Sequence, residues 1–162
     1  MRIPLAVAAG LPVRARRGAV GEEPGEGELL AGAGDKAFCA GGDVKSMAAG
    51  RDHDKTYEDK VHDIRIRMRV SELLHEMGKP TIAMVNGWCF GGAFTPLVSC
   101  DLAIAADTAR FCTPGVNIGL FCSTPAVALS RAVPAKSALE MLLTGEMIGA
   151  ATLMQAAERV LV

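Results

Sequence analysis

No run of about 18 apolar residues occurs in this chain, so no segment of it is expected to span a membrane. An excess of basic residues is lacking as well. Lys and Arg number 17 against 18 Asp and Glu, which leaves a formal net charge of -1. Because nothing in this balance predicts a basic surface for phosphates, a nucleic-acid partner is not expected.

The sequence also lacks the residue spacings that hold metals and nucleotides. Its five cysteines form no CxxC pair and no Cys/His zinc pattern, so free, buried thiols are expected. No P-loop occurs. The pattern Gly32-x-Gly34-x-x-Ala37 is rejected as a dinucleotide site, because Gly41 and Gly42 would interrupt the helix that such a site needs. No bound metal or separate cofactor is therefore expected.

Glycine and proline are concentrated in residues 1–34, which hold seven glycines and three prolines. We therefore predict a poorly ordered leader or linker over 1–34 and a single domain over 35–162. The first 20 residues contain four arginines and no acidic residue, as a mitochondrial presequence does, but they lack serine and contain two prolines. The expected location is cytoplasmic and bacterial-like, with the mitochondrial matrix as the alternative.

Helical and strand patterns alternate in the rest of the chain. Apolar residues recur at helical spacing over about 54–77, and Gly78 followed by Pro80 predicts the end of that helix. Further strands are predicted over 81–86, 101–107 and 110–112, and further helices over 94–99, 135–144 and 150–157. This alternation favours an α/β fold with parallel strand pairing.

Two glycine-rich stretches are candidates for a ligand site, GAGDKAFCAGGDVK over 32–45 and NGWCFGGAFTPLVSCD over 86–101. Small residues let a ligand approach the backbone, and free N–H groups can donate to a negative oxygen. One amide from each stretch would form an oxyanion hole. The alternative is that Gly91, Gly92 and Ala93 only permit tight packing of a strand against a helix, and the residues alone leave both interpretations open.

Several motifs in register resemble the crotonase superfamily, the enoyl-CoA hydratase/isomerase family. KAFCAGGDVK and VNGWCFGGA are similar to its two signature loops, and the helix ending in GKPTIAMVNG separates them by the expected length. SCDLAIAADTARFCTPGVNIGL and ALEMLLTGEMI are similar to the segments that follow. The resemblance covers Gly32 to about Val162. It implies a crotonase-like ββα spiral with a mostly parallel buried sheet, apparently truncated at both ends.

The resemblance implies an acyl-CoA thioester substrate, whose enolate two backbone amides stabilise. Carried over by position, those amides belong to Ala40 and Gly92. The substrate-binding backbone would come from Ala37, Ala40, Asp43, Val44 and Gly91. Coenzyme A is then part of the substrate, and the family further implies lyase or isomerase chemistry in fatty acid metabolism. A family-typical homotrimer or dimer of trimers is doubtful here, because the C-terminal helices that pack it are not recognisable.

Two carboxylates of the family pattern are missing. Hydratases of this family use two glutamates to activate one water, and the equivalent positions hold Thr95 and Gly115. Cys122 lies near the place where some relatives carry a catalytic acid, and a thiolate can act there, although most such cysteines are packing residues. Asp101 matches a structural aspartate of the family. We therefore expect an enzyme with weak or altered activity. The alternatives are a non-catalytic acyl-CoA-binding or regulatory protein and a truncated product without function.

Two shorter stretches resemble particular members of the family. TPGVNIGLFCSTPAVALSRAVP is similar to the subgroup of enoyl-CoA hydratase domain-containing protein 3, whose members lack glutamate at the same positions. NGWCFGG is similar to hydroxycinnamoyl-CoA hydratase-lyases, but these keep the second glutamate. Gly115 therefore argues against the hydratase-lyase activity.

Overall fold

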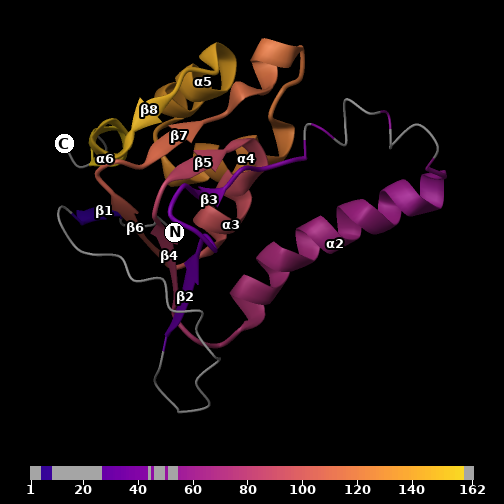
Figure 1. Cartoon of the computed structure of the whole chain (residues 1–162), viewed down its shortest axis with the longest axis horizontal. Helices are drawn as coiled ribbons and strands as arrows, with labels where there is room; N and C mark the ends of the chain where they lie inside the picture. Colours follow the sequence, from indigo (N-terminus) through magenta and orange to yellow (C-terminus); the bar gives the residue numbers. More distant parts are fainter. Residues whose placement is uncertain (1–4, 9–26, 44, 46–49, 51–54, 159–162) are drawn as a thin grey trace.

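The computed structural model describes residues 5–8, 27–43, 45, 50 and 55–158, and these form two four-stranded sheets (Figure 1). Sheet A has the order β1 (Leu5–Ala8), β6 (Leu102–Ala106), β4 (Thr81–Val85) and β2 (Glu28–Ala31), with every pair parallel. Sheet B has the order β3 (Ala37–Cys39), β5 (Trp88–Phe90), β7 (Arg110–Cys112) and β8 (Ile148–Gly149). Only the β7–β8 pair is antiparallel. The predicted α/β class with mostly parallel strands is confirmed.

From β2 to β7 the chain alternates between the two sheets. Strands β2, β4 and β6 enter sheet A, and each is followed by a short connection to β3, β5 or β7 in sheet B. A helical segment follows each of these sheet B strands: α2 after β3, η1 and α3 after β5, and η2 and α4 after β7. Each repeat of two strands and one helical segment adds one strand to each sheet, which is the ββα spiral that the resemblance implies.

The core lies where the helices cover the strands. Helices α3 (Phe94–Ser99), α4 (Ser123–Ala132), α5 (Ala135–Thr144) and α6 (Ala150–Glu158) surround it. Buried alanines, Ala83 on β4 and Ala103 and Ala105 on β6, let neighbouring elements approach closely. The rings of Phe94 and Phe111 pack with their centroids 6.1 Å apart and join α3 to β7. This packing places the start of α3 against sheet B.

Helix α2 (Tyr57–Glu76) begins at a capping box and extends away from the sheets. The hydroxyl of Thr56 accepts from the Asp59 amide, and the Asp59 carboxylate accepts from the Thr56 amide. The C-terminal end of α2 lies beside the sheets, whereas its N-terminal end lies far from them (Figure 1). Apolar side chains therefore remain on its surface, among them Ile64, 54% exposed, and Met68, 56% exposed.

The predicted elements from 54 onward are confirmed, while the prediction over 1–34 needs a correction. Strand β2 lies inside the range expected to be a linker, and the backbone of 5–8 pairs with β6. The short sequence ELLA carries no clear strand pattern by itself, but Leu29 and Leu30 pair with Ile82 and Ala83 of β4. Residues 1–4 and 9–26 of the predicted leader lie outside the described residues. The domain boundary at residue 34 stays a prediction.

Candidate active site

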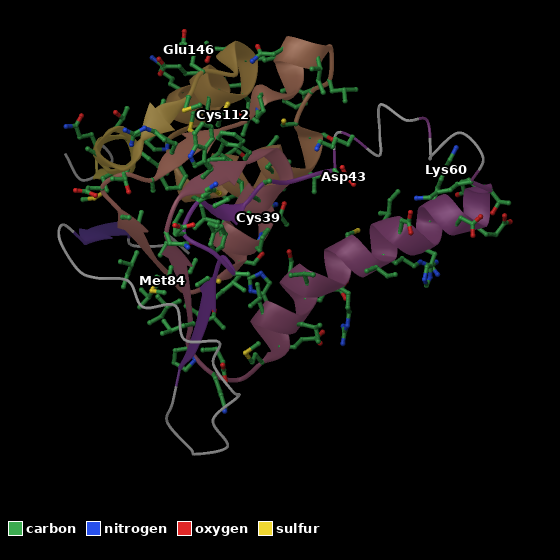
Figure 2. The ribbon with its side chains drawn as sticks, in the orientation of Figure 1. Cys39, Asp43, Lys60, Met84, Cys112 and Glu146 are labelled. Carbon is green, nitrogen blue, oxygen red and sulfur yellow. The ribbon has the colours of Figure 1, made fainter. Side chains whose placement is uncertain are left out.

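The first candidate loop follows β3, at the edge of sheet B. Ala37 is half-buried in β3, while Ala40 and Asp43 are exposed beyond its end. Asp43 accepts from the amide of Lys45 at 3.1 Å, which closes a short turn. Figure 2 shows Cys39 on β3 and Asp43 farther along, on the side of the body toward α2. Val44, a predicted substrate contact, lies outside the described residues.

The second candidate loop joins β5 to α3. Phe90 ends β5 in an extended conformation, and Gly91 (φ +51°) then opens the 3-10 segment η1 (Gly91–Ala93). The first N–H groups of a helical segment have no carbonyl partner inside it, and Gly92 is exposed. The strand therefore does turn into a helical segment at the small residues, as the sequence predicts.

The two loops touch each other at glycines. Gly41 adopts φ +77°, a left-handed conformation that favours glycine. A Cβ at Gly41 would lie 2.4 Å from the carbonyl oxygen of Phe90 and 3.1 Å from the amide nitrogen of Gly92. Only a residue without a side chain permits this contact. The sequence marks Gly41 only as a helix breaker, whereas the structure places it where the first loop touches the second.

Thr95, predicted to replace the first glutamate, lies in α3. Its Oγ1 is buried and has no hydrogen-bond partner among the described residues. Its carbonyl oxygen accepts a hydrogen bond from the hydroxyl of Ser99 at 2.8 Å. A buried hydroxyl without a partner is costly, so it marks a place where a bound group can supply one.

Gly115, predicted to replace the second glutamate, is buried in the 3-10 segment η2 (Pro114–Ile118). A Cβ at this position would lie 2.6 Å from the carbonyl oxygen of Leu120 and 2.7 Å from the sulfur of Cys122. The amide of Leu120 donates to the carbonyl of Gly115 at 2.8 Å and holds this turn closed. The space for a side chain at 115 is thus already filled, and part of it is filled by a thiol.

Segment η2 is anchored to the end of α5 by two buried side chains. The hydroxyl of Thr113 donates to the carbonyl of Met141 at 2.7 Å, and the thiol of Cys112 donates to the carbonyl of Gly145 at 3.1 Å. Figure 2 shows Cys112 in the part of the molecule where β7 meets the C-terminal helices. These bonds hold the residues directly before η2 against the C-terminal end of α5.

The five cysteines are all free, in agreement with the sequence prediction. Cys89, Cys100 and Cys112 are buried, and in each case burial raises the pKa of the thiol. Cys39 and Cys122 are only half-buried and pack against the edge of the core. The described residues contain no group of three or more His, Cys, Asp or Glu side chains that could hold a metal.

Asp101 joins the first residues of the central strands of sheet A. Its carboxylate accepts from the amide of Thr81 at 2.8 Å and from the Thr81 hydroxyl at 2.9 Å, and its own amide donates to Thr81. The bonds from the Thr81 amide and hydroxyl lower the pKa of Asp101 below its ordinary value. Asp101 therefore has a structural role, as the resemblance implies.

Within the described part of the chain, no helix has the length and apolar character needed to cross a membrane.

Comparison with known proteins gives relatives of one kind. The family model described as "Enoyl-CoA hydratase/isomerase" matches residues 25–157. Enoyl-CoA hydratase domain-containing protein 3, mitochondrial, from Xenopus laevis is 42% identical over 129 residues, which are 80% of this chain and 42% of that protein. Hydroxycinnamoyl-CoA hydratase-lyase from Pseudomonas fluorescens is 42% identical over 137 residues, which are 79% of this chain and 47% of that protein.

A solved structure gives the same result for the fold. The crystal structure of human enoyl coenzyme A hydratase domain-containing protein 3 superposes with a TM-score of 0.65 at 42% identity, covering 80% of this chain and 47% of that one. The chain thus spans less than half the length of these relatives. The crotonase-like fold and the resemblance to this subgroup are confirmed, and the chain belongs to the enoyl-CoA hydratase/isomerase family.

Proposed function

We propose that this protein binds an acyl-CoA thioester and stabilises the negative oxygen of its enolate with two main-chain amides, those of Ala40 and Gly92. The observation that supports this most directly is the contact between the two glycine loops, where Gly41 packs against the Gly92 amide nitrogen. Ala40 and Gly92 are both exposed, so a ligand can reach them. The backbone of Ala37, Asp43, Val44 and Gly91 would hold the rest of the ligand.

Oxyanion stabilisation needs N–H groups that are already in position. A short, positively polarised segment such as the start of η1 offers such a donor without a side chain, and a second donor from the first loop fixes the oxygen between them. Removing one donor of this kind typically lowers the rate of reaction by about 10²–10³. The small residues at 41, 91 and 92 then serve close approach of the thioester to the backbone.

Proton transfer is the weaker half of the proposed chemistry. Thr95 and Gly115 stand at the positions where the resemblance places the two glutamates, and neither supplies a carboxylate. A positioned acid or base typically contributes about 10²–10⁴-fold. We therefore expect hydration of an enoyl-CoA to be slow relative to a glutamate-bearing member of the family. The comparisons do not favour the alternatives, a non-catalytic binder or a product without function.

We also propose that the protein lies in the mitochondrial matrix. The Xenopus relative is named as mitochondrial, which supports the mitochondrial matrix over the bacterial-like cytoplasm. Fractionation of cells that produce the tagged protein tests this location. Recovery with cytosolic markers alone would contradict it.

Binding of a matched pair of ligands tests the oxyanion hole without requiring turnover. Butyryl-CoA has the thioester carbonyl, whereas S-butyl-CoA has the same chain length and no carbonyl oxygen. A hydrogen bond contributes about 0.5–1.5 kcal/mol, and about 1.4 kcal/mol is tenfold in affinity, so we expect butyryl-CoA to bind roughly tenfold more tightly by calorimetry.

Two substitutions at Gly92 test whether its N–H is the hydrogen-bond donor. Gly92→Pro removes the N–H and should abolish the preference for butyryl-CoA. Gly92→Ala keeps the N–H, and its Cβ would lie 4.0 Å from the Gly41 Cα, an ordinary contact, so it should retain more of that preference. Gly149→Ala, outside both loops, controls for adding a methyl group. An unchanged preference in Gly92→Pro would refute the proposed site.

A further inference from the structure

We propose that Cys39 and Cys89 form a reversible redox pair, and that their disulfide ties the two candidate loops together and strengthens acyl-CoA binding. Cys39 ends strand β3, which runs into the first loop, and Cys89 lies in strand β5, which runs into the second. A peroxide is the oxidant, and a small thiol such as glutathione is the reductant. The effect on ligand binding rests on the proposed function, whereas formation of the disulfide does not.

The pairing of β3 with β5 places the two cysteines opposite each other. Ala37 is the register partner of Trp88, so in a regular ladder Cys39 would lie opposite Phe90. Cys39 and Cys89 would then point to opposite faces of the sheet, because successive side chains of a strand alternate. A register irregularity between Ala37 and Cys39 changes this, and Cys39 becomes the partner of Cys89. Irregularities of this kind turn a side chain toward a different neighbour.

The separation of neighbouring strands suits a disulfide. Strands in a sheet lie about 4.7–4.9 Å apart, and disulfides join residues whose Cα atoms are about 4.4–6.8 Å apart. Burial is the main cause of the raised pKa of Cys89, and the nearby thiol of Cys39 raises it further. The backbone pairing and this side-chain interaction therefore agree that the two thiols are near each other.

The two thiols differ in exposure, which gives the reaction an order. Cys39 is half-buried, so a small oxidant can reach its sulfur, whereas Cys89 is 0% exposed. Hydrogen peroxide converts the Cys39 thiol to a sulfenic acid and releases a water. The Cys89 sulfur then attacks the Cys39 sulfur, the sulfur–oxygen bond breaks, and the hydroxyl leaves as a second water with the proton of Cys89. Exchange with glutathione reverses the step and gives two thiols and glutathione disulfide.

The disulfide would lie beside the contact between the two loops. Cys39 directly precedes Ala40, one of the two proposed amide donors, and Gly41 packs against the amide nitrogen of Gly92, the other donor. Among the described strands, β3 is at the edge of sheet B and pairs only with β5. A covalent tie to Cys89 therefore holds the two donors at a fixed separation. Because a site that is already ordered loses less freedom on binding, the oxidised protein should bind the thioester more tightly.

A second pair of cysteines provides the comparison. Cys112 and Cys122 also interact electrostatically, but Cys122 lies outside the strands and the Cys112 thiol already donates to the carbonyl of Gly145. Cys122 is half-buried like Cys39, so a small oxidant can reach both thiols. Cys122→Ser is therefore the matched control, because it removes a half-buried thiol and leaves the proposed pair intact.

Oxidation of the reduced protein with hydrogen peroxide, followed by alkylation of the remaining thiols, tests the pair. Tryptic mapping without reduction should show two peptides joined through Cys39 and Cys89, with the loss of two hydrogen atoms. Trypsin leaves Cys89 and Cys100 on one peptide, so fragmentation has to place the bond on Cys89. Glutathione should release both peptides.

Three variants complete the mapping experiment. The link should be absent in Cys39→Ser and in Cys89→Ala and be kept in Cys122→Ser. Circular dichroism melts show which variants are folded, and Cys39→Ser, at a half-buried position, carries the result if Cys89→Ala does not fold. A link from Cys39 to Cys100, or a link confined to Cys112 and Cys122, would overturn the proposed pair.

Calorimetric binding of butyryl-CoA to the reduced and oxidised protein separates the two proposals. Oxidation should tighten binding several-fold in the wild type and in Cys122→Ser, and should have no such effect in Cys39→Ser. Unchanged or weaker binding by the oxidised protein would overturn the coupling and leave the proposed function standing. Binding by the reduced protein without any link between Cys39 and Cys89 would overturn the redox pair alone. A disulfide in a protein that binds in neither state would overturn the proposed function and, with it, the coupling.

Discussion

Two glycines show how residues of one type differ in role at this site. Gly41 is required by its positive φ and by the close approach of the second loop. Gly115 adopts no such conformation, and its hydrogen side chain is required because Cys122 and the carbonyl of Leu120 fill the adjacent space. The space that a side chain at 115 would need is thus already occupied by its own neighbours in the chain.

Gly115→Glu is therefore not expected to produce hydratase activity. The new Cβ would lie 2.6 Å from the Leu120 carbonyl oxygen, a main-chain atom, and overpacking of this kind typically costs about 1–3 kcal/mol. We expect a lower midpoint of denaturant unfolding and no gain in the rate of crotonyl-CoA hydration.

Gly34→Glu is the matched control for adding a glutamate at a glycine. No atom lies within 4 Å of a Cβ at Gly34, so its unfolding midpoint should change little. Unchanged stability of Gly115→Glu, together with a rise in hydration, would contradict the packing described for η2.

At the scale of strands and helices, the sequence predicts the elements that have their own pattern. The helix over 57–76 and the helix over 135–144 follow from their apolar patterns and from Gly78 and Gly145 at their ends. The strands β4 and β6 follow from short apolar runs. Strand β5 and helix α4 were not predicted. Strand β5 is three residues long between glycines, and α4 carries Pro125 in its first turn.

The candidate site, too, could be predicted from the sequence only in part. The two glycine loops could be found because their residues are adjacent in sequence and match a family pattern. The contact of Gly41 with Gly92 and the approach of Cys122 to Gly115 could not, because each joins residues whose distance is set by turns and by packing of separate elements. Strand β2 was missed for the same reason, since its pairing with β4 is non-local.

Asp101, directly before β6, is bonded to Thr81, the first residue of β4. The pairing of these two strands should therefore depend on pH. The pKa of Asp101 in the folded protein is lower than the ordinary value of 3.8, so the carboxylate contributes stability that is fully present above that value. As the pH falls through the lower folded pKa, this contribution is lost. Asp101→Asn should therefore lower the Tm at pH 7, and its Tm should approach that of the wild type in acid.

Circular dichroism melts from pH 7 down to about pH 2 measure this convergence, because a carboxyl with a lowered pKa loses its contribution below its ordinary value. Asp107→Asn is the control, since Asp107 follows the other end of β6 and is exposed. A Tm difference between Asp101→Asn and the wild type that stays constant with pH would show that the carboxylate charge has no part in holding the strands.

At the scale of the whole molecule, the described surface carries many large apolar side chains, and they gather along two parts of the chain. One set follows α2, and a second follows η2 to α5, where Ile118 is 60% exposed and Leu143 is 62% exposed. The sequence predicts apolar periodicity in the helix over 54–77, but it does not show that this helix leaves the body of the molecule (Figure 1).

These surfaces predict self-association of the purified chain. Burial of apolar area contributes about 25 cal/mol per Å², so a contact that buries enough of these side chains to offset the lost freedom of two separate chains favours assembly. Sedimentation velocity should show an average mass that rises with protein concentration above the 16.9 kDa of the single chain. Met68→Lys, which places a charge among the apolar residues of α2, should shift the distribution toward that mass, whereas Glu58→Gln on the same helix should not. A single species of the monomer mass at all concentrations would show that the exposed side chains do not drive association, and Met68→Lys would then have no effect.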